Sequence, residues 1–120
     1  MNREIKFRAW NKYDGKMDNY LEDISCRAFS SYENLMQYTG FIDKNNKEIY
    51  EGDIVKAYIP NHTVEPTEVI SSISFSEGSF IFLNINKEPL TLRETIKISK
   101  GVEVVGNLYE NPEILTPLAT

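Results

Sequence analysis

The sequence predicts a mainly β protein, built as a small antiparallel β-barrel with an N-terminal hairpin and one short helical turn. Six or seven short segments of strand character recur at a spacing near ten residues, and turn-forming residues separate them. A chain of 120 residues falls within the usual size of one domain. A sandwich is the alternative, but a closed barrel is the simpler choice because closure removes exposed strand edges.

The N-terminal hairpin is predicted from an alternation with the period of a strand. One face would carry Ile5, Phe7 and Ala9, and the other Lys6, Arg8 and Trp10. Residues 11–16, centred on Asp14 and Gly15, predict a reversing turn, and residues 17–24 the return strand. The first strand therefore presents a charged and aromatic outer face.

Residues 31–38 are interpreted as a short helix or helical turn. Ser30 or Ser31 could cap it, and Gly40 would end it. Its inward side chains would be Leu35, Met36 and Tyr38.

From Phe41 onward the pattern is β throughout. The longer strands are predicted at residues 54–59, 67–75, 80–85, 90–98 and 102–108, with turns at residues 43–47, 51–53 and 76–79. The proline-flanked residues 60–66 are interpreted as a long hairpin loop, because a split there would leave two fragments too small for separate cores. Residues 111–113 predict a short helical turn.

Composition limits the classes of function. A net charge of −5 and a pI near 4.9 argue against a general nucleic-acid binder. Two stretches are locally basic: residues 1–10, and residues 87–100 with four basic side chains against two acidic ones. No signal peptide or membrane span is predicted, so we expect a soluble cytoplasmic protein. Cys26 has no second cysteine for a disulfide, and we expect it to be a small buried hydrophobe.

No set of residues predicts an enzyme. His62 has no second histidine or nearby cysteine with which to hold zinc, and no nucleophile elbow accompanies it. Acidic residues gather at residues 14–23 and 48–53, but Asp and Glu beside Gly or Asn are typical of turns. We therefore expect no catalytic residue, no metal site and no cofactor.

The strongest surface hypothesis concerns Lys6, Arg8 and Trp10. Two cations alternating with an aromatic ring could hold the phosphate and base of a nucleic acid. They could also anchor a protein interface, since Trp and Arg are enriched at binding hot spots. The third interpretation is an ordinary amphipathic strand that packs its side-chain stems on its neighbours. The sequence leaves these three interpretations open.

Segments at the start, middle and end of the chain resemble, in the same order, the YopX family. They are REIKFRAW at residues 3–10, LMQYTG at 35–40, DKN at 43–45, EIYEGDIV at 48–55 and VGNLYENPE at 105–113. The three segments between residues 35 and 55 form one block, and three ordered blocks are more specific than one short motif. Asn46, where the family commonly has glycine, and Asn11, where it often has aspartate, are departures that keep the turn propensity.

The resemblance implies a single YopX-like domain over residues 1–120. Residues 1–40 would form the N-terminal hairpin and short helix, and residues 41–120 an SH3-like β-barrel. The family consists of small proteins encoded by phages and prophages of bacteria, and the resemblance implies a chain that assembles as an oligomer. No enzymatic activity or ligand is established for the family, so no catalytic residue carries over to this chain.

Two functional hypotheses follow. The leading one is a non-enzymatic phage accessory protein that acts by contact with phage or host protein and by self-association. The alternative is a nucleic-acid-binding module for phage replication or transcription control. It depends on Lys6, Arg8, Trp10 and the basic residues 87–100.

Overall fold

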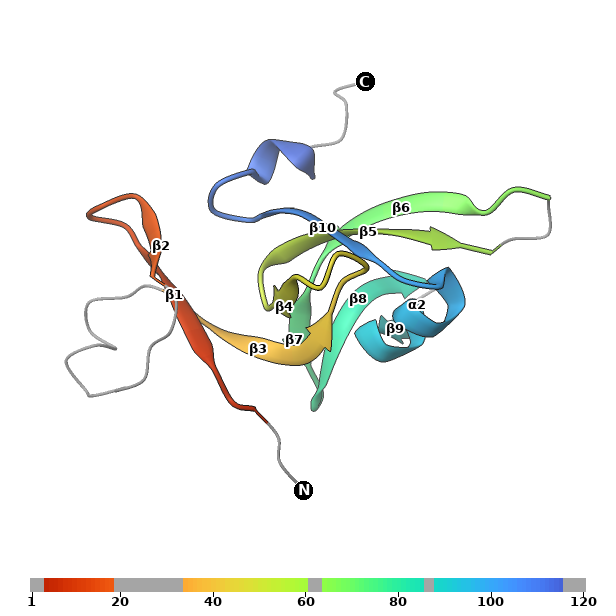
Figure 1. Cartoon of the computed structure of the whole chain (residues 1–120), viewed down its shortest axis with the longest axis horizontal. Helices are drawn as coiled ribbons and strands as arrows, with labels where there is room; N and C mark the ends of the chain where they lie inside the picture. The colour runs from red at the N-terminus through yellow and green to blue at the C-terminus, as the bar shows by residue number, and fades with distance from the viewer. Residues whose placement is uncertain (1–3, 19–33, 61–63, 86–87, 116–120) are drawn as a thin grey trace.

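The computed structural model describes residues 4–18, 34–60, 64–85 and 88–115. These residues form ten strands, one α-helix and one short 3-10 helix, so the predicted mainly β fold is confirmed (Figure 1). Neither described helix is long and apolar enough to cross a membrane. Cys26 and His62 lie outside the described residues.

The first sheet joins the N-terminal hairpin to the rest of the fold. Its antiparallel strands, in spatial order, are β2 (Lys16–Asp18), β1 (Phe7–Asn11), β3 (Asn34–Ile42) and β4 (Glu48–Tyr50). The predicted hairpin is confirmed over β1 and β2, where the N–H of Gly15 donates to the carbonyl of Asn11 in the connecting turn. Because β1 lies between β2 and β3, it is an interior strand of this sheet.

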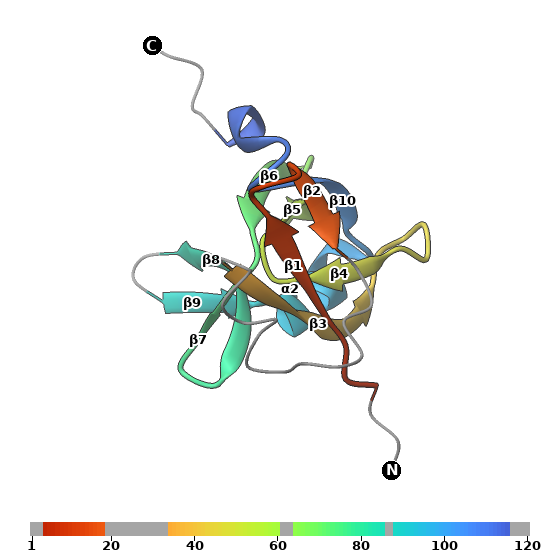
Figure 2. The same cartoon turned by 90° about the vertical axis from the view of Figure 1, so that its left-hand side faces the viewer.

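Two three-stranded antiparallel sheets make up most of the remaining fold. One has the order β10 (Glu103–Asn107), β5 (Asp53–Ile59), β6 (Thr67–Ser72), and the other β7 (Ser74–Ser76), β8 (Ser79–Ile85), β9 (Glu88–Thr91). Ile73 alone separates β6 from β7, and it exchanges backbone hydrogen bonds with Asp53 and Gly52. The chain bends there from one sheet into the other, and the strands curl into a half-barrel (Figure 2).

The core collects side chains from all three sheets and from the helix α2 (Leu92–Ser99). Its fully buried members are Ile49, Val55, Ala57, Ile73, Phe82, Leu92 and Val102. In β5 the period of two explains the pattern, because Val55 and Ala57 face the core while Tyr58 faces outward. In β8, Ile81 and Phe82 are both buried, as the continuous apolar run predicts.

The helix predicted at residues 31–38 is wrong wherever the structure describes that segment. Residues 34–38 belong to β3, and residues 30–33 lie outside the described part of the chain. β3 pairs with β1, and its Met36 and Tyr38 are buried on alternate positions. Gly40, expected to end the helix, has φ of +88° inside β3, where the register to β4 shifts. Tertiary pairing with β1 therefore decides the conformation of this segment.

The strand predicted at residues 90–98 is wrong from Leu92 onward. Strand β9 ends at Thr91, and α2 follows directly. The hydroxyl of Thr91 accepts the N–H of Glu94 at 3.1 Å, which is an N-cap contact. Leu92 and Thr95 lie three residues apart and are both fully buried. The cap and the buried helix face outweigh the β propensity of the branched side chains in this segment.

Several other expectations about turns are confirmed. Asn46, Glu77 and Gly78 have positive φ at the predicted turns, and Pro112–Ile114 form the short 3-10 helix η1. The strands on either side of the loop predicted at residues 60–66, β5 and β6, pair antiparallel, while residues 61–63 lie outside the described part of the chain. The boundary predicted at residue 40 falls inside β3. The SH3-like detail of the barrel stays a prediction.

Candidate functional site

Arg8 belongs to the charged and aromatic outer face that the sequence predicts for the first strand, but in the structure it lies inside the molecule. It comes from the interior strand β1 and is only 7% exposed. Its Nη2 donates to Oδ1 of Asp53 at 2.7 Å and to the backbone carbonyl of Glu51 at 3.2 Å. The guanidinium carbon also lies 4.7 Å from the ring centroid of Tyr50. Arg8 is therefore one half of a buried ion pair.

Asp53 is the other half of this pair and is 2% exposed. Its Oδ2 accepts the N–H of Tyr50 at 2.8 Å. Burial raises the pKa of Asp53 by more than the charge of Arg8 and the N–H of Tyr50 lower it. Within the described part of the chain, the buried Nε of Arg8 has no hydrogen-bond partner. The pair holds β1 against the turn between β4 and β5. The free energy that the two charges lose on leaving water is only partly recovered by these contacts.

Lys6 is held by carboxylates. Its ammonium forms an ion pair and hydrogen bond with Glu48, and a second ion pair with Glu4 at 3.2 Å. The hydrogen bond to Glu48 is the main cause that raises the pKa of Lys6. The hydroxyl of Tyr50 donates to Glu48 at 3.3 Å, and burial is the main cause that raises the pKa of Tyr50 to about 12. Lys6, the residue before β1, and Glu48 therefore link the start of the N-terminal hairpin to β4.

Trp10 stacks on Tyr109. The ring centroids are 5.4 Å apart and the planes differ by 15°. Tyr109 follows β10, in a turn that Asn107 shapes by accepting the N–H groups of Tyr109 and Glu110. The stack therefore ties the N-terminal hairpin to the segment after the last strand.

These contacts form what we call the β1 junction: Lys6 with Glu48, Arg8 with Asp53, and Trp10 with Tyr109. The expectation of a free outer face is corrected, because Arg8 is buried and all three side chains have partners within the chain. Every contact joins the first family-like segment to a later one. The geometry is that of an amphipathic strand packed on its neighbours, and contact of these residues with a partner or a nucleic acid stays a prediction.

Besides Glu48 and Asp53, three acidic residues noted in the sequence have backbone or amide partners in the described segments. Asp14 and Asp18 accept hydrogen bonds from Nδ2 of Asn11 at 3.2 and 3.4 Å, and Glu51 accepts the N–H of Gln37 at 2.9 Å. Among residues 4–18, 34–60, 64–85 and 88–115, no group of three or more His, Cys, Asp or Glu could hold a metal ion.

Asp43 is a further buried carboxylate. Its Oδ1 accepts the N–H groups of Asn45 and Lys47, each at 2.8 Å, and its Oδ2 accepts the N–H of Val104 at 3.0 Å. Burial raises the pKa of Asp43, but these three N–H groups lower it by more, so the pKa lies below its usual range. Asp43 thus connects the β3–β4 turn to β10.

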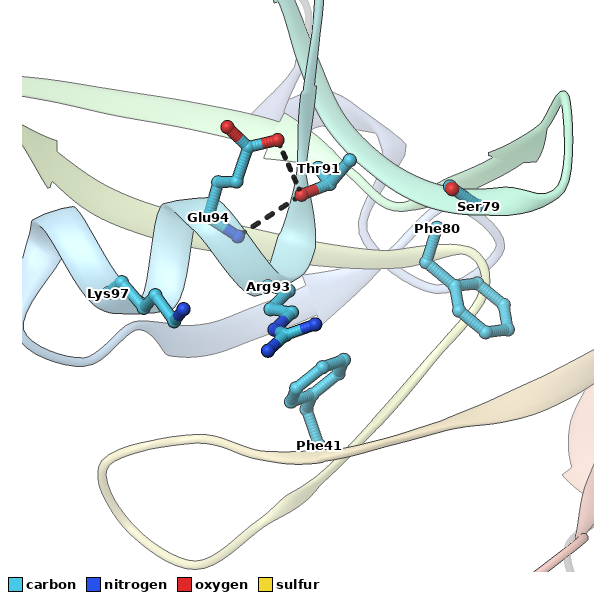
Figure 3. A pocket seen from close by; sticks show the side chains of 7 residues that line it. All are labelled: Phe41, Ser79, Phe80, Thr91, Arg93, Glu94 and Lys97. Atoms are coloured by element: carbon cyan, nitrogen blue, oxygen red, sulfur yellow. Dashed lines mark hydrogen bonds between the residues drawn. The ribbon is translucent and has the colours of Figure 1, made fainter.

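An open pocket of about 640 Å³ lies beside α2 (Figure 3). Its volume is within the usual range of small-molecule sites. We call it the α2 pocket, and its lining residues are Phe41, Ser79, Phe80, Thr91, Arg93, Glu94 and Lys97. Segments far apart in the sequence therefore meet here: the end of β3, the start of β8, and α2 with the residue that caps it.

The α2 pocket combines two cations with two aromatic rings. In Figure 3 the guanidinium of Arg93 and the ring of Phe41 point toward one another. Glu94 is turned to the other side, where its Oε1 accepts the hydroxyl of Thr91 at 3.0 Å. Among the described residues, no carboxylate forms an ion pair with Arg93 or Lys97. Both cations remain available to a ligand.

The sequence indicated only part of this pocket. The basic stretch of residues 87–100 contains Arg93 and Lys97, but its interpretation as a strand gave no reason to place Phe41 or Phe80 beside them. The threonine at position 91 followed three residues later by Glu94 is the pattern of a capping box and could have indicated the helix.

The fold and these two regions define a small antiparallel β domain. The charged side chains of its N-terminal strand pair with other residues of the same chain, and its open pocket lies in a different place, beside α2. The family model described as "YopX protein" matches residues 18–116. The chain belongs to the YopX family, and the resemblance seen in the sequence is confirmed.

A solved structure shows the same fold. It is the crystal structure of protein EF1440 from Enterococcus faecalis, with a TM-score of 0.67 and 23% sequence identity. The match covers 95% of this chain and 99% of that chain. A search of curated proteins finds no relative that matches.

Proposed function

We propose that this chain is a non-enzymatic accessory protein, encoded by a phage or prophage, that acts in the bacterial cytoplasm through protein–protein contact and self-association. The observation that carries the proposal is a group of exposed apolar side chains on β5, on β6, on their connection and at the end of α2. We call it the β5–β6 patch, and its members are Tyr58, Val64, Ile70 and Ile98. Figure 1 shows these elements at the end of the molecule opposite the β1–β2 hairpin.

The patch has a defined geometry. Tyr58 follows the buried Ala57, and Ile70 pairs across the hairpin with Lys56, so both side chains lie on the outward face. They are 41% and 39% exposed. Val64 and Ile98 line a groove of about 270 Å³ together with Tyr58. Exposed apolar side chains gathered on one surface are typical of a protein interaction site.

The adjoining strand edge suits a second copy of the chain. In the described sheet, β6 has β5 on one side and no strand on the other. Its one charged residue, Glu68, lies 3.7 Å from Lys56 in an ion pair, and it contains no lysine or proline of the kind that protects edge strands. An antiparallel β6–β6 pairing about a twofold axis at Ile70 would set Glu68 opposite Ser72, without like charges facing each other. The proposed occupant of the patch is therefore another copy of this protein.

The non-enzymatic and phage parts have separate support. The buried charges Arg8, Asp53 and Asp43 are held by one another or by backbone groups, as structural charges are. Membership of the YopX family supports the phage or prophage origin. A gene that lies away from any phage or prophage gene would contradict that origin.

Size-exclusion chromatography with light scattering tests the proposal. We expect a mass above the 13.9 kDa of one chain at micromolar concentration, and a return to that mass in Ile70→Lys. Ile42→Lys is the matched control, because Ile42 is 48% exposed but lies outside the patch. A wild-type protein that runs as one chain, or an oligomer that Ile70→Lys leaves intact, would contradict self-association through this surface.

The structure changes which residues could carry the alternative function, the binding of nucleic acid. Lys6 and Arg8 both have carboxylate partners within the chain, so they are poor candidates for phosphate contacts. That alternative now depends on the basic residues of α2.

A further inference from the structure

We propose that the α2 pocket binds a nucleotide, as a free molecule or as one unit of a single strand, with the phosphate on Arg93 and Lys97 and the base against Phe41 and Phe80. This inference goes beyond self-association and uses a different surface. Its failure would therefore leave the proposed function untouched.

The cations supply the first part of the argument. Arg93 and Lys97 lie four residues apart on α2, so both project from the same side of the helix. Four other basic residues, Lys6, Arg8, Lys44 and Lys56, form ion pairs with carboxylates of the chain. Arg93 and Lys97 have no such partner among the described residues, although the protein as a whole is acidic. Two unpaired cations within one pocket form a local site for an anion.

The rings supply the second part. Phe41 and Phe80 are only partly buried, and both line the pocket. Phe80 is fixed in place, since its ring lies edge-on to Phe75 with centroids 5.1 Å apart, and both Phe41 and Phe80 pack against the hydrophobic core. A rigid aromatic surface beside cations is the arrangement by which proteins stack a base and hold its phosphate.

The combination favours a nucleotide over an acidic peptide. A carboxylate peptide would use the cations but has no need of two partly buried rings in the pocket wall. A nucleotide carries both a flat apolar face and a phosphate, and the pocket volume of about 640 Å³ is ample for one unit. A duplex keeps its base faces stacked, so a single strand or a free nucleotide is the form that fits.

Fluorescence anisotropy with labelled oligothymidylate and oligoadenylate of about 12 nucleotides tests the proposal. We expect binding at about 50 mM salt that weakens as salt rises, with a slope near −1.4 in log affinity against log salt for two phosphate contacts on a single strand. Competition with AMP, TMP and inorganic phosphate shows whether the pocket takes a free nucleotide, one unit of a single strand, or phosphate alone. Displacement by a mononucleotide at comparable affinity supports a free nucleotide, and displacement only by oligonucleotides supports a strand.

Variants locate the site. Arg93→Gln/Lys97→Gln should reduce affinity at least about tenfold, and Phe80→Leu, which keeps an apolar side chain against the core but removes the ring, should reduce it about tenfold. Lys16→Gln/Lys47→Gln removes two exposed lysines that do not line the pocket and should keep wild-type affinity. Glutamine keeps good helix propensity at the exposed positions 93 and 97, and circular dichroism checks the fold of every variant.

Three results would overturn the proposal. The first is the absence of binding to every nucleotide probe at low salt. The second is binding that Arg93→Gln/Lys97→Gln leaves unchanged. The third is a pocket that takes an acidic peptide or inorganic phosphate as tightly as any nucleotide.

Discussion

Arg8 and Asp53 are 45 positions apart in the sequence and form a buried ion pair in which Nη2 lies 2.7 Å from Oδ1. Arg8 lies in the N-terminal strand β1, and Asp53 begins the core strand β5. The pair therefore joins the N-terminal sheet to the central part of the fold. Both residues belong to family-like segments, which gives those segments a structural reason to occur together.

Removing Arg8 should destabilise the protein strongly. Arg8→Met leaves Asp53 buried without its counter-charge, and we expect a loss of about 3–5 kcal/mol at neutral pH. Burial already raises the pKa of Asp53, and without Arg8 it should rise further. A carboxyl group with a raised folded pKa destabilises the fold as pH rises from its unfolded pKa to its folded pKa, so the deficit of Arg8→Met should grow from the wild-type folded pKa of Asp53 up to neutral pH. Urea denaturation across this range measures it.

A double-mutant cycle provides the control for this prediction. Asp53→Asn keeps an acceptor for the N–H of Tyr50, and Arg8→Met/Asp53→Asn removes both charges. The double variant should cost clearly less than the sum of the two single variants. Additive costs would show that the two residues act independently.

The stack of Trp10 on Tyr109 should stabilise the packing of the N-terminal hairpin on the segment that follows β10. Tyr109→Leu removes the ring pair, and we expect a loss of about 0.5–1.5 kcal/mol beyond the change in buried area. Trp10 is the only tryptophan, so its emission reports the contact directly. Tyr13→Leu, at a tyrosine that is 79% exposed in the same hairpin, should leave stability and emission nearly unchanged. Equal effects of the two substitutions would contradict the stacking role.

Gly52 should be far less replaceable than Gly78, although their backbones match. Their φ angles are +84° and +83°, so alanine costs about 1–2 kcal/mol of left-handed strain at either position. At Gly52 the new Cβ would also lie 2.9 Å from Sδ of the buried Met36, whereas nothing lies within 4 Å at Gly78. Thermal unfolding of Gly52→Ala and Gly78→Ala should show the larger loss at Gly52. A larger loss at Gly78 would contradict this packing.

Asp43 should contribute stability that depends on pH. Asp43 accepts N–H groups on both of its carboxylate oxygens, whereas Asp43→Asn keeps only one acceptor oxygen. We therefore expect the free energy of unfolding to fall by about 1–3 kcal/mol at neutral pH. Because the folded pKa of Asp43 is lowered, its stabilisation is present above the unfolded value and is lost as pH falls through the folded value. The gap between wild type and Asp43→Asn should therefore narrow below about pH 4. A gap that is constant with pH would contradict the assignment, and Asp14→Asn, at an exposed turn, serves as the control.

The sequence predicted much of the fold where local signals agreed with tertiary structure. Turns at Asp14–Gly15, Asn46 and Glu77–Gly78 require left-handed or tight backbone, and the residues present adopt it readily. Two elements were mistaken because tertiary contacts outweigh local preference. Residues 34–38 pair with β1, and residues 92–99 are helical because Thr91 caps them and Leu92 and Thr95 are buried.

The candidate sites were harder to predict from the sequence. Alternation correctly placed Lys6, Arg8 and Trp10 on one side of a strand, but it could not show that Asp53 and Tyr109, at least 45 residues away, cover that side. The α2 pocket likewise depends on Phe41 and Phe80, which reach Arg93 and Lys97 only through folding. Pairings over such sequence distances leave no periodic pattern in the chain.

Copies of the chain are proposed to contact one another through the β5–β6 patch, while the β1 junction only holds the fold together. Hydrogen exchange measured at low and high protein concentration tests this claim most directly. We expect amides of β6 to gain protection as concentration rises, while those of β1 stay unchanged, because β6 is an edge strand and β1 is paired on both sides. Protection that rises in β1, or that does not change with concentration anywhere, would contradict this account.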